Sequence, residues 1–158
     1  MVGGIYGWIG KILRINLTTG ETLKIDTMDY AEKYIGGRGI AAKIAWDEIQ
    51  PGTDAFDPKN RLMFITGPLA GTLAPSSGRV EVCGIAAQNY PTPSYTRSCM
   101  GGHWGAELKY AGYDGVVIQG KASSPVYIWI RDGDVKVESA HDLWGTDSFE
   151  AQRKIEEE

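Results

Sequence analysis

The chain has 158 residues, a net charge of −4 and 42% hydrophobic residues, so it is expected to fold as one globular domain. It contains no basic cluster and no apolar run of about 18 residues, which excludes nucleic acid as the expected partner and a membrane-spanning segment. The start, MVGGIYGWIGKI, lacks the charged and apolar regions of a secretory signal. The two cysteines, Cys83 and Cys99, fit no zinc or iron–sulfur spacing, and a reducing cytoplasm is the expected location.

The first third of the sequence predicts a hairpin followed by two helices. Apolar residues alternate along residues 11–26 on both sides of Thr18-Thr19-Gly20, where the glycine suits a tight loop. A short helix over about residues 30–35 follows, and a glycine pair ends it. The periodic apolar residues of a second helix run over about residues 39–49, up to Pro51.

The middle of the chain predicts two strands separated by loops. Residues 61–67, RLMFITG, are apolar on both faces, which indicates a strand buried on both sides. Residues 79–85 alternate and predict a second strand. Residues 88–98, QNYPTPSYTRS, predict a polar loop that two prolines keep extended.

The last third predicts a helix over about residues 102–111, a short buried strand over residues 114–120 and a hairpin over residues 125–139. A final helix begins near Asp147, with Glu150 at the spacing of a capping box. Strands therefore outnumber helices. The predicted fold class is α+β, a β-rich domain with several short helices.

Residues 37–42, GRGIAA, match the letters of a dinucleotide-binding fingerprint without its context. That fingerprint follows a strand and needs an acidic residue at the end of a second strand. Here a helix precedes the glycines, and Asp57 lies in a loop. The favoured interpretation is a glycine corner between two helices, from which Arg38 could still reach an anion.

Two loops are candidates for binding an anion. Residues 66–79, TGPLAGTLAPSSGR, contain small residues that let a ligand approach the backbone, and end at Arg79. Arg79 could pair with a phosphate or make an ordinary surface ion pair. In residues 98–103, SCMGGH, Gly101 and Gly102 would expose backbone N–H groups at the start of a helix.

Self-contained catalytic machinery is not predicted. Cys99 has no partner nearby in the sequence, and free cysteines are most often small buried hydrophobic residues. Neither His103 nor His141 has a serine or cysteine at a spacing that identifies a nucleophilic triad. Paired carboxylates occur only in segments expected to be exposed, such as the terminal EEE.

Four fragments in order carry a resemblance to a known family: GKILRINLTTG, YIGGRGIAAKIAWDEI, NRLMFITGPLAGTLAPSSGR and GGHWGAELKYAGYDGVVIQGKASSPVYIWI. From about Trp8 onward the chain resembles the amino-terminal domain of the tungsten-containing aldehyde ferredoxin oxidoreductases. The resemblance implies an enzyme with tungsten held between two pterin dithiolenes, a bis-pterin cofactor, beside a four-iron cluster. Such an enzyme oxidises an aldehyde to a carboxylic acid and passes the electrons to ferredoxin.

The resemblance also implies which residues bind the cofactor. In this family the amino-terminal domain is the base on which the bis-pterin cofactor rests, and a magnesium ion bridges the pterin phosphates. The family's pterin-binding arginine in GGR falls on Arg79, and its NSGG segment falls on CMGG, so Cys99, Gly101 and Gly102 are implied as cofactor-binding. A cysteine in place of asparagine loses the amide, but the Cys99 backbone carbonyl could still coordinate magnesium. This departure points first to the tungsten benzoyl-CoA reductases.

Family members are several times longer, and their iron–sulfur cysteines and tungsten-site acidic residues lie in later domains. Residues 1–158 are therefore expected to be the tungstopterin-binding domain, either truncated or excised and inactive alone. Its expected partners are the remaining domains of the enzyme and, through them, ferredoxin or another electron carrier. Two rival hypotheses are a non-catalytic pterin carrier or assembly protein, and a domain without a ligand whose glycines only shape turns.

Overall fold

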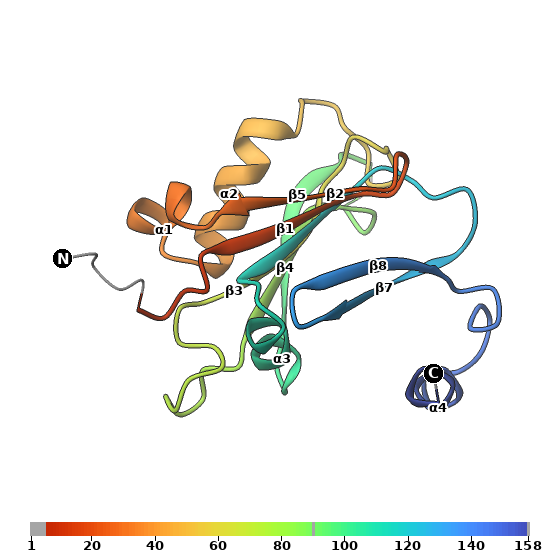
Figure 1. Ribbon diagram of the computed structural model, residues 1–158. Coiled ribbons are helices and arrows are strands. Elements are labelled where there is room, and N and C mark those ends of the chain that lie inside the picture. Colours follow the sequence, from red (N-terminus) through yellow and green to blue (C-terminus); the bar gives the residue numbers. More distant parts are fainter. Residues whose placement is uncertain (1–5, 90, 158) are drawn as a thin grey trace.

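A six-stranded mixed sheet organises the fold (Figure 1). The computed structural model describes residues 6–89 and 91–157. The sheet has the strand order β2-β1-β6-β3-β4-β5, in which β1 and β6 are parallel and the other neighbours are antiparallel. Its strands are β1 (Lys11–Asn16), β2 (Glu21–Asp26), β3 (Leu62–Thr66), β4 (Val80–Ala86), β5 (Ser94–Met100) and β6 (Gly115–Gln119).

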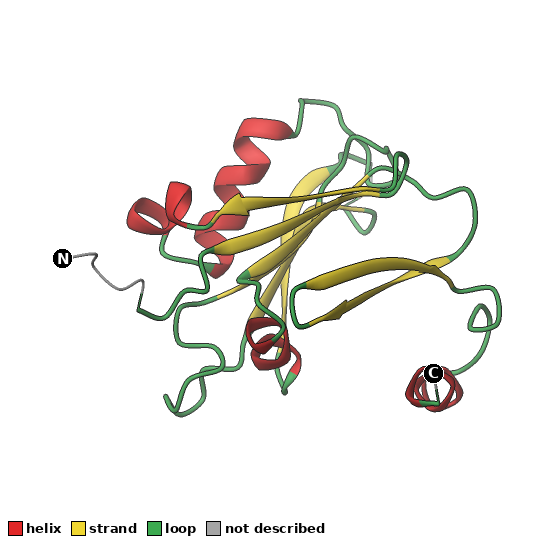
Figure 2. Cartoon of the chain, viewed as in Figure 1, coloured by secondary structure: helices red, strands yellow, loops and turns green. Residues whose placement is uncertain are grey.

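The remaining elements lie outside this sheet, most of them on one of its two faces (Figure 2). They are the helices α1 (Met28–Tyr34), α2 (Gly37–Glu48), α3 (Trp104–Tyr110) and α4 (Ser148–Glu156), and the hairpin strands β7 (Val126–Arg131) and β8 (Asp134–Ser139). Helices α1 and α2 lie on one face, whereas α3 and the β7–β8 hairpin lie on the other. Helix α4 lies apart from the sheet, beyond the hairpin.

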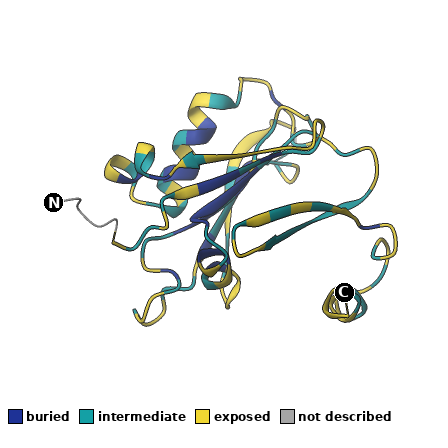
Figure 3. Cartoon of the chain, viewed as in Figure 1, coloured by how far each residue is buried: buried dark blue, intermediate teal, exposed yellow. Residues whose placement is uncertain are grey.

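Two hydrophobic clusters hold these layers together, and the central strands of the sheet are the most buried (Figure 3). On the first face, α2 packs Ile40 and Ile44 against Met63 and Ile65 of β3. On the second face a cluster around Leu13, Ile15, Leu108, Tyr113 and Val116 is covered by hairpin side chains such as Ile128 and Val135. Because β1 and β6 contribute to both clusters, they form the most deeply buried part of the sheet.

The second face of β3 is only partly covered, contrary to the expectation of a strand buried on both sides. Met63 and Ile65 are fully buried beneath α2, but Leu62 is 46% exposed and Phe64 is half-buried. The Phe64 ring contacts that of Trp104, with centroids 5.4 Å apart. Coverage of this face therefore ends near α3, towards the β4–β5 side of the sheet.

Most predicted elements are confirmed. Both hairpins form, α1 and α2 meet at a glycine corner, and the carboxylate of Asp147 caps α4 by accepting hydrogen bonds from the N–H groups of Phe149 and Glu150. The α+β class is confirmed as well, since the described residues form eight strands and four helices.

One predicted loop is wrong. Residues 94–98, assigned to a polar loop, belong to β5, which pairs with β4 over seven residues from Ser94 to Met100. The prolines that suggested a loop precede the strand, and its serine and threonine content hid an edge strand. This strand changes the site, because it carries Cys99 within the sheet rather than in a loop before α3.

Candidate functional site

The two candidate loops meet at one end of the sheet. The last pair of the β4–β5 ladder joins Val80 to Met100, so Arg79 and Gly101 follow directly beyond it on adjacent strands. The backbones also touch, since a Cβ atom built on Gly78 would lie 2.8 Å from the carbonyl oxygen of Gly102. Segments more than twenty residues apart therefore form one surface, here called the corner: Gly78, Arg79, Cys99, Gly101 and Gly102.

The glycines of the corner leave its backbone open. Gly102 has a φ of +89°, a conformation that side-chain-bearing residues rarely adopt. A Cβ atom on Gly101 or Gly102 would have no atom within 4 Å, so the space beside both residues is free. Helix α3 begins at Trp104 and has only seven residues, starting later than predicted. The corner therefore offers open backbone rather than a long helix dipole.

Arg79 does not make an ordinary surface ion pair. Its side chain is exposed and, within residues 6–89 and 91–157, it forms no hydrogen bond or ion pair. Arg61 pairs with Glu48 at 3.0 Å and Arg97 with Glu81 at 3.6 Å. Among the described residues, Arg38 and Arg153 form no ion pair either. An unpaired guanidinium beside open backbone is suited to bind an anion such as a phosphate.

The Cys99 side chain is engaged within the domain. Arg97 Nη1 donates to Cys99 Sγ at 3.1 Å, and the thiol lies 3.5 Å from Glu81 Oε1. Glu81 pairs with Ile65 of β3, and a Cβ atom built on Gly37 at the start of α2 would lie 3.3 Å from Glu81 Cγ, so this cluster lies on the helix-covered face of the sheet.

The second cysteine is a buried structural thiol. Cys83 is 2% exposed and lies in the α2-side cluster. Burial raises the pKa of the Cys83 thiol above its ordinary value. Burial also raises the pKa of Tyr95, and the hydrogen bond between the two side chains raises it further. Both groups therefore stay protonated at neutral pH.

The described residues contain no group of three or more histidine, cysteine, aspartate or glutamate side chains that could hold a metal ion. His141 Nδ1 lies 3.2 Å from Asp142 Oδ1 on an exposed turn, and the Ser139 hydroxyl accepts from the His141 backbone N–H at 3.3 Å rather than facing the ring. No helix in the part of the chain that the structure describes is long and apolar enough to cross a membrane.

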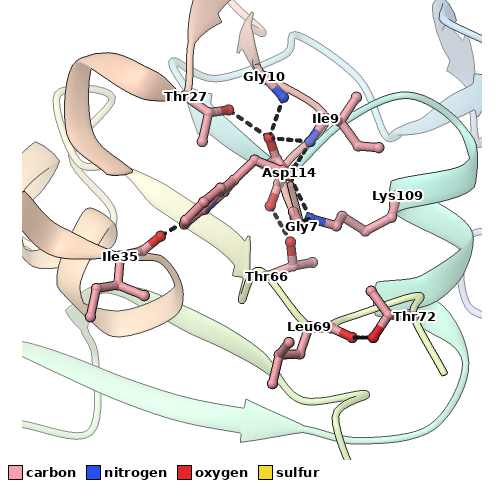
Figure 4. Close-up of polar contacts among 11 residues, drawn as sticks. Gly7, Ile9, Gly10, Thr27, Ile35, Thr66, Leu69, Thr72, Lys109 and Asp114 are labelled. Carbon is pink, nitrogen blue, oxygen red and sulfur yellow. Dashed lines mark hydrogen bonds and ion pairs between the residues drawn. The ribbon is translucent and has the colours of Figure 1, made fainter. Parts of the chain in front are cut away.

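A buried polar cluster at the same end of the sheet as the corner was not predicted from the sequence (Figure 4). Lys109 of α3 and Asp114 form an ion pair at 2.6 Å, and their side chains are only 5% and 2% exposed. Asp114 also accepts hydrogen bonds from the N–H groups of Ile9 and Gly10 and from the Thr27 hydroxyl. Lys109 donates to the Gly7 carbonyl as well, at 2.7 Å.

This cluster, here called the clasp, consists of Lys109, Asp114, Thr27 and the backbone of residues 7–10. The sequence held one signal for it: a lysine and an aspartate flanking the short apolar segment YAGY between a helix and a strand. Charged residues are seldom fully buried unless they are paired, so the sequence alone favoured surface positions for both side chains.

The α+β domain thus combines open glycine backbone with an exposed arginine at one end of its sheet. The chain belongs to the aldehyde ferredoxin oxidoreductase family, because residues 12–158 match the family's N-terminal domain. Helix α1, which precedes residues 37–42, agrees with a glycine corner and not with the dinucleotide-binding fingerprint, which follows a strand.

Known relatives extend this match. The chain is 41% identical over 157 residues to a tungsten-containing aldehyde ferredoxin oxidoreductase of Pyrococcus abyssi, covering 98% of this chain and 25% of that protein. It is 32% identical over 155 residues to the WOR-like subunit of an aliphatic sulfonate oxidoreductase of Pyrococcus furiosus, covering 96% of this chain and 24% of that subunit.

A solved structure has the same fold. It is the active-site complex BamBC of benzoyl coenzyme A reductase with 1,5-dienoyl-CoA, and it superposes with a TM-score of 0.90 at 36% identity. The match covers 96% of this chain and 23% of that one. The chain thus spans about a quarter of the length of the relatives it matches.

Proposed function

We propose that residues 1–158 form the tungstopterin-cradling amino-terminal domain of a longer tungsten oxidoreductase, one that oxidises aldehydes to carboxylic acids and transfers electrons to ferredoxin. The observation that carries this proposal is the exposed, unpaired Arg79 beside the open backbone of Gly101 and Gly102. The family match and the tungsten-containing relatives support it.

The corner fits the chemistry of a pterin phosphate. The Arg79 guanidinium would pair with phosphate or pterin oxygens, and the N–H groups of Gly101 and Gly102 would donate to the same anionic edge. The Cys99 carbonyl is the proposed magnesium ligand, while its thiol stays with Arg97 and Glu81. If the cofactor contact at position 99 is made by the backbone carbonyl, the side-chain amide of the family's asparagine is not needed.

This domain would bind and orient the cofactor, and it would contribute no catalytic side chain of its own. The bound tungsten group would supply the redox chemistry of aldehyde oxidation. The acidic residues at the metal and the 4Fe–4S cluster would come from the remaining domains, which are also the proposed route to ferredoxin. A cytoplasmic location is part of the proposal.

A second candidate is the active-site subunit of a benzoyl-CoA reductase-like enzyme. It is favoured by the superposition on the benzoyl coenzyme A reductase complex and by the CMGG segment at Cys99. The two candidates share the same cofactor corner and differ in substrate. Assays of the intact enzyme with an aldehyde and with benzoyl-CoA would separate them.

The test is to measure tungsten, iron and pterin in the protein that the intact gene encodes, purified without oxygen. The proposal predicts tungsten and pterin in the purified protein, together with iron. A product that carries pterin without metal or redox activity would instead support a carrier or assembly protein. A product with neither would overturn the cofactor proposal and leave a domain without a ligand.

A further inference from the structure

The loop between β3 and β4, residues 67–79, leads into Arg79 and is held at its start by the clasp. Thr66 donates from both its N–H and its hydroxyl to the main-chain carbonyl of Asp114, at 2.9 and 2.6 Å. The backbone of residues 7–10 lies against the same point, since a Cβ atom on Gly7 would be 2.8 Å from the Pro68 carbonyl oxygen.

The same loop is held at its middle and its end by α3. The Tyr110 hydroxyl donates to the Gly71 carbonyl at 3.1 Å, and a Cβ atom on Gly71 would lie 3.3 Å from Lys109 Cβ. At the other end of the helix, a Cβ atom on Gly105 would lie 3.4 Å from the Gly78 carbonyl oxygen. Helix α3 therefore supports the loop along its length.

The position of α3 depends in turn on the buried ion pair. Lys109 lies on the helix, whereas Asp114 lies on the turn that enters β6 and is fixed by Ile9, Gly10 and Thr27. A buried charge whose partner is removed becomes strongly unfavourable, so either side chain alone would move or draw in water. Such a shift would displace Thr66, which is hydrogen-bonded to Asp114, and also Gly71 and the corner, which lie against α3.

We propose that Lys109 and Asp114 are positioning residues for the cofactor corner: by fixing α3 and the start of the loop, they keep Arg79 and Gly101-Gly102 on one surface. This inference rests on the proposed function. In this proposal Lys109 and Asp114 do not contact the cofactor. Loss of the pair is predicted to weaken cofactor retention more than an equally destabilising substitution elsewhere in the domain does.

The test uses the intact, cofactor-loaded protein and compares Lys109→Met with two controls. Lys43→Met removes a lysine whose pair with Asp47 has the same 2.6 Å distance but lies on the surface of α2. Ile44→Ala opens the α2-side core, with a destabilisation of the same order as loss of a buried ion-pair partner. Deuterium exchange of residues 67–79 and the rate of pterin and tungsten release are measured for each, at a temperature where all remain folded.

The expected result is release about tenfold faster in Lys109→Met, the scale on which residues supporting a bound group act. Faster exchange in residues 67–79 should accompany it, with neither change in the controls. If Lys109→Met does not accumulate as folded protein, Asp114→Asn is the milder variant, because it removes the charge and keeps side-chain oxygen for Ile9 and Gly10. Asp114→Asn should also release the cofactor faster and show faster exchange in residues 67–79.

Unchanged release and exchange in the folded Lys109→Met or Asp114→Asn protein would overturn the positioning role. Equal release from Ile44→Ala would also overturn it, because cofactor loss would then follow general stability. These outcomes leave the proposed function standing. A wild-type protein without pterin and tungsten would overturn the proposed function itself.

Discussion

The clasp and the corner both place a cation beside backbone, yet they differ in how that cation is satisfied. Lys109 is buried and has two oxygen partners within 2.7 Å, those of Asp114 and Gly7. Arg79 is exposed and has no partner among the described residues. The cation of the clasp is paired within the domain, whereas the cation of the corner is available to pair with a ligand.

This difference predicts opposite consequences for substitutions. Changes in the clasp remove interactions that the folded state already has, so they reduce the free energy of unfolding. Changes in the corner remove interactions that form only when a ligand binds, so they reduce occupancy and lower stability mainly by the share that the bound ligand contributes. Each variant is therefore tested for both quantities.

The largest effect on stability is expected from Lys109→Met. It leaves the Asp114 carboxylate buried with neutral partners only, and the free energy of unfolding should fall by about 3 kcal/mol. Native-state hydrogen exchange of the β1 and β6 amides in the intact protein measures this loss. Lys43→Met, which breaks an exposed pair of equal length, should leave exchange unchanged. A loss below about 1 kcal/mol in Lys109→Met would mean that the clasp is not a stabilising unit.

An intermediate effect is expected from Gly102→Ala, which separates backbone strain from ligand binding. Gly102 and Gly20 both have positive φ, +89° and +75°, and open space beside Cα. Alanine at either position should therefore cost about 1 kcal/mol of stability through strain. Only Gly102→Ala should also lower the pterin content, since Gly20 lies in the β1–β2 loop. Equal pterin content in both variants would remove Gly102 from the corner's binding role.

A smaller, pH-dependent effect is expected in the strands that carry the corner. The folded-state pKa values of Cys83 and Tyr95 are raised above their ordinary values of 9.0 and 10.0, chiefly by burial. Their contribution to stability is thus complete below pH 9 and is lost as the pH rises through the folded-state pKa values. Thermal unfolding midpoints should fall above pH 9, and Tyr95→Phe should flatten that fall. An unchanged slope in Tyr95→Phe would show that Tyr95 is not the group responsible.

The sequence predicted elements well where local chemistry decides them. The hairpin at Asp132-Gly133 and the cap at Asp147 are specified by residues that favour those turns, and both form as expected. Strand β5 was missed because its pairing with β4 comes from tertiary contacts rather than from its own apolar pattern.

The site was predictable as a set of residues but not as a surface. Motif order indicated Arg79, Cys99, Gly101 and Gly102, whereas their proximity depends on the β4–β5 register and on the contact between Gly78 and Gly102. The clasp could not be predicted in this way, because nothing local distinguishes a buried Lys109–Asp114 pair from two surface charges.

The central claim is that Arg79 is kept unpaired for a cofactor, and Arg79→Ala in the intact protein tests it most directly. Arg131→Ala is the matched control, since Arg131 is 74% exposed and lies on the β7–β8 hairpin. The measurement is tungsten and pterin content per chain, with the unfolding midpoint recorded alongside. The account predicts a clear loss of both from Arg79→Ala, with a midpoint no lower than that of cofactor-free wild-type protein, and normal content in Arg131→Ala. Normal tungsten and pterin content in Arg79→Ala would contradict it.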